Sequence, residues 1–125
     1  MTRKKKIQLE YTINCSPKVL FNRLSSASGL AEWFADDVRM EGKIYTFLWK
    51  GSEESAELSL IKENKLVRFT WKEDERTYFE FRITQDELTG DVALLVTDFG
   101  EEDEKEDIIN LWNNHVSLLR HVLGS

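Results

Sequence analysis

Two polar side chains stand out because they occupy positions that are otherwise apolar. His115 lies on the apolar side of a helix expected over residues 103–123, where an imidazole could exchange a proton or anchor a ligand. Asp98 follows the apolar run of residues 92–97 and shares an alternate face with Leu94, so a buried Asp98 could act as a general acid or base. Ordinary roles stay open, since core histidines often bond a backbone carbonyl and strand-end aspartates often meet water.

Other residues offer little reactive or metal-binding chemistry. Cys15 is the sole cysteine and is best interpreted as a small buried hydrophobe. His115 and His121 are separated by about 240° around a helix, so they cannot chelate one metal ion from a single face. Asp36 and Asp37 lack the spaced ligands of a calcium loop, and the sequence has no glycine-rich phosphate loop or nucleophile elbow. We therefore expect no metal site, no cofactor and no ATP or acyl-transfer chemistry.

The composition is that of one globular domain spanning residues 1–125. Hydrophobic residues make up 41% of the chain, and seven Phe, four Trp and three Tyr can supply a core without disulfides. Seventeen Lys and Arg against 23 Asp and Glu give a net charge of −6, which argues against a nucleic-acid partner. No unbroken apolar segment is long enough for a leader or a membrane span, so we expect a cytoplasmic protein that does not insert into membranes.

Alternating apolar and polar residues predict a first strand over residues 7–13 and six later strands. Two short helices are expected between them, over residues 17–24 and around residues 30–34. The later strands cover residues 38–40, 45–49, 56–60, 67–71, 79–83 and 92–99, with Ala56, Leu58 and Leu60 on one face of theirs. Short polar loops between these strands favour antiparallel hairpins.

Residues 103–123 form the clearest helix in the sequence. Its apolar side chains, Leu111 and Leu118 included, fill an arc of roughly 180° when set at about 100° per residue. Such an arc is wider than a surface helix needs, so we expect a curved sheet to cradle the helix. The elements together predict the α+β class.

The order of the elements and several short motifs resemble the helix-grip fold of the START-like superfamily, also called SRPBCC. The motifs are residues 16–21 (SPKVLF), 30–34 (LAEWF), Gly42, 66–71 (LVRFTW), 111–112 (LW) and 118–119 (LL). They are similar to the branch of heat-shock-protein-90 ATPase activator homologues and span nearly the whole chain. The resemblance implies a curved antiparallel sheet of about seven strands wrapped around the C-terminal helix, with a cavity between them that receives apolar molecules.

The leading hypothesis is therefore a protein that binds a small hydrophobic ligand, such as a lipid-like, polyketide-like or other apolar metabolite, in that cavity. Alternation turns the aromatic residues of the central strands inward, because their neighbours are charged. The expected ligand-binding residues are Trp33, Phe34, Tyr45, Phe47, Trp49, Phe69, Trp71, Phe79, Phe81, Trp112, His115 and Leu119. The same side chains are also the best core candidates, so both roles are open for each.

Two alternatives accompany this hypothesis. The branch suggests a chaperone-related protein-interaction module, for which the acidic run of residues 101–107 could dock a basic partner. The same run also suits the start of a helix, where the dipole favours negative charge. A cyclase or dehydratase would need two polar groups in the cavity, for which His115 with Asp98 or Tyr45 are the candidates. We expect binding rather than catalysis, and the sequence leaves the oligomeric state open.

Overall fold

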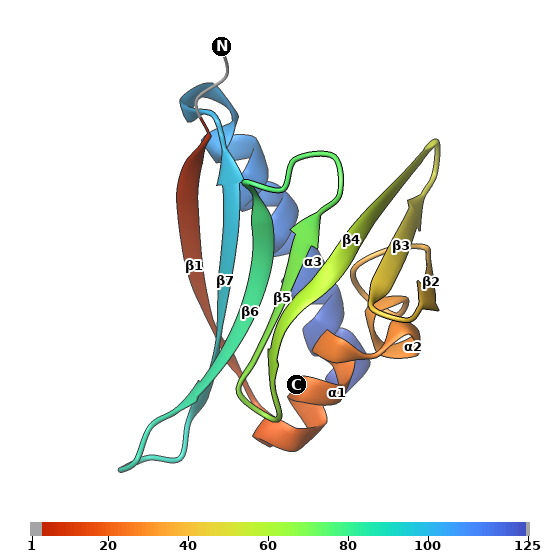
Figure 1. Cartoon of the computed structure of the whole chain (residues 1–125). Coiled ribbons are helices and arrows are strands. Elements are labelled where there is room, and N and C mark those ends of the chain that lie inside the picture. Colours follow the sequence, from red (N-terminus) through yellow and green to blue (C-terminus); the bar gives the residue numbers. More distant parts are fainter. Residues whose placement is uncertain (1–3, 125) are drawn as a thin grey trace.

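The computed structural model describes residues 4–124 and contains one curved antiparallel sheet with a long helix across it (Figure 1). The strands are β1 (Lys5–Ile13), β2 (Asp37–Glu41), β3 (Ile44–Trp49), β4 (Ser52–Lys62), β5 (Leu66–Trp71), β6 (Tyr78–Gln85) and β7 (Val92–Gly100). The helices are α1 (Pro17–Ser25), α2 (Ala27–Leu30), the 3-10 turn η1 (Glu102–Glu104) and α3 (Lys105–Leu123). The sheet order is β1-β7-β6-β5-β4-β3-β2. The α+β helix-grip expectation is confirmed.

The long helix α3 lies behind the sheet in Figure 1, while α1 and α2 lie at one end of it. Hydrogen bonds from two side chains, Tyr11 and Arg120, join α3 to β1. The Tyr11 hydroxyl donates to Asn113 Oδ1 at 2.7 Å, and the Arg120 guanidinium donates to the Thr12 carbonyl at 2.6 Å. These bonds fix one side of the helix along the β1 edge of the sheet.

The inner face of the sheet carries the aromatic core, as the alternation predicts. Phe47, Phe69 and Phe81 are fully buried. Cross-strand pairing sets Phe69 opposite Phe79, with ring centroids 5.0 Å apart. Stacked aromatic pairs of this kind add to the free energy already gained by burying their area.

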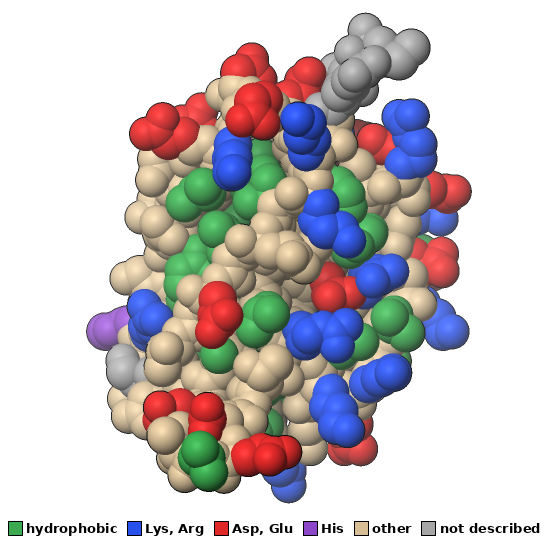
Figure 2. Space-filling view, turned by 90° about the vertical axis from the view of Figure 1, so that its left-hand side faces the viewer, with side chains coloured by type: hydrophobic (Ala, Val, Ile, Leu, Met, Phe, Trp, Pro, Cys, Tyr) green, Lys and Arg blue, Asp and Glu red, His purple; other side chains and the backbone are tan. Residues whose placement is uncertain are grey.

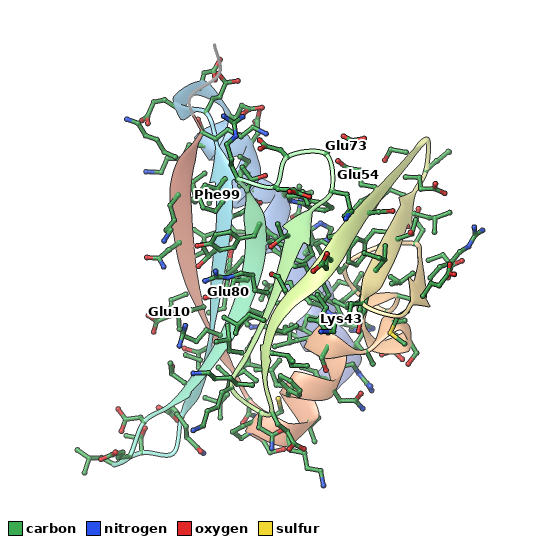
Figure 3. The ribbon with its side chains drawn as sticks, in the orientation of Figure 1. Glu10, Lys43, Glu54, Glu73, Glu80 and Phe99 are labelled. Atoms are coloured by element: carbon green, nitrogen blue, oxygen red, sulfur yellow. The ribbon has the colours of Figure 1, made fainter. Side chains whose placement is uncertain are left out.

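The outer face of the sheet is charged. Glu80 lies on this face of β6 and accepts two hydrogen bonds from the Arg68 guanidinium, at 2.8 and 3.0 Å (Figure 3). The Arg68 guanidinium also covers the Tyr78 ring, 4.1 Å from its centroid. Seen from the β1 side, acidic and basic side chains are mixed over the molecule (Figure 2). On the outer face, Arg68 gives the buried Glu80 carboxylate a partner.

The second short helix is displaced from its expected position around residues 30–34. It spans Ala27–Leu30, because Ser26 caps it by accepting a hydrogen bond from the Gly29 N–H at 3.0 Å. Gly29 also lets α2 approach α1, since a Cβ there would lie 2.6 Å from the Asn22 carbonyl oxygen. The expected start near residue 30 was wrong, because the Ser26 cap begins the second helix one residue after α1 ends.

Strand β4 departs from simple alternation. A bulge at Ser59 sets Leu58 opposite Phe69 but Leu60 opposite Arg68. The extra residue reverses the face of the sheet to which each later side chain of β4 points. The expectation that Leu60 shares a face with Ala56 was therefore wrong.

The apolar arc of α3 is narrower in the structure than its sequence suggests. Trp112, Val116 and Leu119 are buried along one seam, whereas Leu111 is 53% exposed and Leu118 is 46% exposed. The sheet curves around only part of the helix, so both leucines at the margins of the arc stay in contact with solvent.

Replacement of Phe47 tests the packing of this core. Phe47→Ala removes a fully buried ring from the inner face, so we expect the free energy of unfolding to fall by about 3–5 kcal/mol. Urea denaturation followed by circular dichroism measures the change. Val19→Ala, at a residue 49% exposed on α1, is the control and should change the value by no more than about 0.5 kcal/mol. Similar losses in both variants would contradict a core centred on Phe47.

Candidate functional site

A cleft of about 340 Å³ lies between α3 and one end of the sheet. Its volume is at the lower end of the range for small-molecule sites. Strands β3 to β7, the turn after α2 and helix α3 all contribute to its walls. The lining residues are Phe34, Trp49, Ser52, Glu54, Trp71, Phe79, Asp98, Leu111, Trp112 and His115.

Three buried aromatic side chains form the floor of the cleft. Phe34, Phe79 and Trp112 are each no more than 4% exposed. The Phe34 ring stacks on the Trp112 ring with centroids 5.6 Å apart, and its centroid is 5.0 Å from that of Phe79. Because these rings pack on one another, the floor is rigid and apolar.

Two half-buried tryptophans extend this aromatic surface toward solvent. Trp49 Nε1–H donates to the Phe34 carbonyl at 2.8 Å, which fixes the orientation of its indole. The Trp71 ring lies 5.0 Å from the Phe79 ring. Tryptophan faces that are partly exposed beside a buried floor are well suited to contact a small ligand.

His115 lines the cleft and is held by the backbone. Its Nδ1 lies 3.3 Å from the Trp33 carbonyl oxygen, which can only accept, so Nδ1 carries the proton and Nε2 is the acceptor nitrogen. Burial lowers the pKa of His115, and the hydrogen bond to Trp33 opposes this shift in part. Burial therefore favours the neutral imidazole, and His115 makes the backbone contact that its ordinary role predicts.

Asp98 lies on the inner face of β7, as alternation with Leu94 predicts. Its Oδ2 accepts a hydrogen bond from Trp112 Nε1–H at 2.8 Å, and its Oδ1 accepts one from the Phe99 N–H at 2.7 Å. Burial raises the pKa of Asp98, while these two hydrogen bonds and the charge of Lys4 act against the rise. Within residues 4–124, no ion pair involves Asp98.

The rim contains three residues that the sequence reasoning missed. Ser52, Glu54 and Leu111 are exposed and border the opening. Glu54 pairs with Phe47 across the β3–β4 hairpin, which places its side chain on the inner face. Residues 51–54 read as a turn because they are polar, whereas β4 already begins at Ser52. Extending the alternation back from Ala56 would have revealed Glu54.

Six of the twelve expected ligand-binding residues line the cleft: Phe34, Trp49, Trp71, Phe79, Trp112 and His115. The other six are buried in the core and do not line it: Trp33, Tyr45, Phe47, Phe69, Phe81 and Leu119. The Tyr45 hydroxyl donates to the Ser25 carbonyl at 2.8 Å, and Trp33 Nε1–H donates to the Arg23 carbonyl at 2.8 Å. Both hydrogen bonds tie their side chains to α1, so neither polar group is free to contact a ligand.

The other candidates from the sequence, Cys15 and the acidic run of residues 101–107, do not line the cleft. Cys15 is half-buried against the core, and burial raises the pKa of its thiol, which disfavours a thiolate. In the acidic run, the Glu101 N–H donates to Glu104 Oε1 at 2.9 Å as part of a capping box at the start of η1.

Within residues 4–124, no three His, Cys, Asp or Glu side chains are grouped to hold a metal ion. No helix in the same range is long and apolar enough to cross a membrane.

Comparisons with known proteins agree with this fold. A family model described as a START-like superfamily domain matches residues 1–125. A Bacteroides fragilis protein solved by NMR is 40% identical, has a TM-score of 0.68, and aligns over 98% of this chain and 93% of its own. A search of curated proteins gave no significant match.

Two more distant structures share the fold alone. The Aha1 dimer from Colwellia psychrerythraea is 19% identical, with a TM-score of 0.70 and coverage of 95% of this chain and 92% of that one. DynU16, from the dynemicin biosynthetic locus, is 13% identical, with a TM-score of 0.79 and coverage of 96% of this chain and 47% of that one.

The titration of Asp98 should be visible in protein stability. Burial raises the pKa of Asp98, so as the pH increases the unfolded chain loses this proton first and the free energy of unfolding falls. Asp98→Asn removes the titration and keeps an oxygen acceptor. We expect the stability of the wild type relative to Asp98→Asn to fall as the pH rises through and above the ordinary pKa of an aspartate, about 4, measured by urea denaturation. A constant or rising difference would contradict a raised pKa.

Proposed function

Because the chain belongs to the START-like superfamily, we propose that it binds a small apolar molecule in the cleft between α3 and the sheet. The observation that carries the proposal is the aromatic floor of Phe34, Phe79 and Trp112, which is continuous with the half-buried Trp49 and Trp71. Concave apolar surfaces with a few polar groups at their edge are the usual small-molecule sites. The site residues are the six expected side chains that line the cleft, together with Leu111 on its rim.

A cyclase-type enzyme is the second candidate, because His115 and Asp98 line the same cleft. A neutral imidazole and a carboxyl of raised pKa are suitable proton-transfer partners. The hydroxyl of Tyr45, the third polar group considered, donates a hydrogen bond to the Ser25 backbone carbonyl and does not line the cleft. Binding is preferred to catalysis, since it needs only the apolar surface.

A chaperone-related role has weaker support. The Aha1 dimer is 19% identical to this chain, so that likeness concerns the fold alone. The acidic run already serves as a helix start through its capping box. This alternative predicts partner binding with no occupant in the cleft.

The four tryptophans make the binding test internally controlled. Trp49, Trp71 and Trp112 line the cleft, whereas Trp33 is buried beneath its floor against the Trp112 ring, and its Nε1–H donates to the Arg23 carbonyl. Octanol is a suitable neutral, apolar probe. We expect its titration to shift the indole N–H signals of the three cleft tryptophans in ¹H–¹⁵N NMR spectra and to leave the Trp33 signal in place. Unchanged spectra, or shifts at Trp33 alone, would contradict binding in the cleft.

Two exposed leucines on α3 provide a matched pair of variants. Leu111 lines the cleft and Leu118 does not, although both are about half exposed. Leu111→Arg introduces a charge at the apolar rim, so we expect octanol affinity to fall about fivefold, corresponding to a loss of about 1 kcal/mol of apolar contact. Leu118→Arg should leave the affinity unchanged in the same NMR titration. Equal effects of both substitutions would move the binding site away from this cleft.

A further inference from the structure

We propose that the ligand carries a cationic ammonium group, which lies at the end of the cleft bordered by Glu54, Trp71 and Asp98. This inference rests on the proposed function and specifies the chemical class of the molecule bound. The apolar part of the ligand covers the aromatic floor, and the ammonium group lies beside the carboxylates. Two independent features of the site support this arrangement.

The first feature is the kind of apolar surface that the cleft presents. Its aromatic side chains include three tryptophans, whose ring faces attract cations more strongly than those of the other aromatic residues. The half-buried Trp49 and Trp71 have ring surface that is not covered by the core. An aliphatic lining would bind an apolar tail equally well, but it would not favour a positive charge.

The second feature is an excess of carboxylates where the cleft opens. A neighbouring hollow of about 210 Å³ shares Glu54, Trp71 and Asp98 with the cleft and adds Glu73 and Asp74. Glu54 on β4 and Glu73 on the loop after β5 lie near each other at this end of the sheet (Figure 3). The site therefore continues from an aromatic surface into an acidic opening.

The cations near this opening are engaged by Asp74. Lys4 lies 3.7 Å from its carboxylate and also lines the hollow, and the Arg76 guanidinium lies 3.1 Å from it. Among residues 4–124, no ion pair involves Glu54, Glu73 or Asp98, although the charge of Lys4 acts on Asp98 from a longer range. Asp98 is the most enclosed of the three, and its two hydrogen bonds, from the Trp112 indole and the Phe99 amide, fix its position.

The chemistry of the opening distinguishes an organic cation from other ligands. The carboxylates are not grouped to hold a metal ion within the described residues. An anionic head group would be repelled by Glu54 and Asp98, and a neutral one would leave their charges uncompensated. An ammonium group on an apolar body satisfies both the aromatic surface and the carboxylates.

Three probes with the same octyl chain test the proposal on the full-length protein: octyltrimethylammonium, octanol and octanoate. We expect octyltrimethylammonium to bind at least about tenfold more tightly than octanol and octanoate to bind least, in titrations that follow the indole signals of Trp49, Trp71 and Trp112. Equal affinities for the cation and octanol, or tighter binding of octanoate, would overturn the cationic preference and leave the proposed function intact. Failure of all three probes to bind would overturn both.

Charge-neutralising variants locate the effect. Glu54→Gln and Asp98→Asn should each weaken octyltrimethylammonium binding about fivefold more than they weaken octanol binding. Glu53→Gln is the matched control, because Glu53 adjoins Glu54 in β4 but pairs with Leu48 on the opposite face. Glu54 is exposed, so its substitution keeps the test valid even if Asp98→Asn fails to fold. Equal losses from Glu53→Gln and Glu54→Gln would indicate attraction by net charge alone and overturn the site.

A final variant separates the aromatic contribution from the carboxylates. Trp71→Leu keeps an apolar side chain but removes the ring face. We expect the affinity for octyltrimethylammonium to fall at least about threefold more than the affinity for octanol. Equal losses for the two probes would mean that Trp71 contributes only apolar area, and would overturn its role as a cation contact.

Discussion

The rest of the structure depends on the contact between Trp112 and the inner face of the sheet. The Trp112 ring stacks on Phe34 at 5.6 Å and meets Phe81 edge to face at 5.7 Å, while its Nε1–H donates to Asp98 at 2.8 Å. Burial of the ring and pairing of its polar atom are thus achieved together, which sets both the height and the rotation of α3 above the sheet. The position of α3 in turn determines where the sheet stays uncovered.

The cleft exists because α3 covers the curved sheet only in part. Its buried seam of Trp112, Val116 and Leu119 is narrow, and Leu111 stays at the margin as part of the rim. Beyond this margin the inner face is built from rings that already pack against one another. Such rings cannot rearrange to fill the remaining space without losing those contacts, so the space persists as a cleft with an aromatic floor.

Asp98 connects the stability of the fold with the chemistry of the site. Its carboxylate is needed to pair the Trp112 indole, yet burial disfavours its charge and raises its pKa. The bonds from Trp112 and Phe99 and the charge of Lys4 offset part of this cost, but no ion pair within residues 4–124 involves Asp98. A cation bound beside Asp98 would compensate the charge and would bind the folded state alone, so ligand binding and folding would be coupled there.

The sequence alone determined the strands, the long helix and the inward direction of the aromatic residues, because these follow from alternation and helical periodicity over a few residues. It also placed Asp98 on the inner face. It could not separate Phe34 and Trp71, which line the cleft, from Phe47 and Phe69, which fill the core, because all four obey the same local pattern. Only the tertiary structure made that distinction, and only it brought Glu54 to the rim beside Asp98. Whether an inward side chain is covered depends on how far a helix remote in sequence reaches across a curved sheet, and no local pattern of residues specifies that distance.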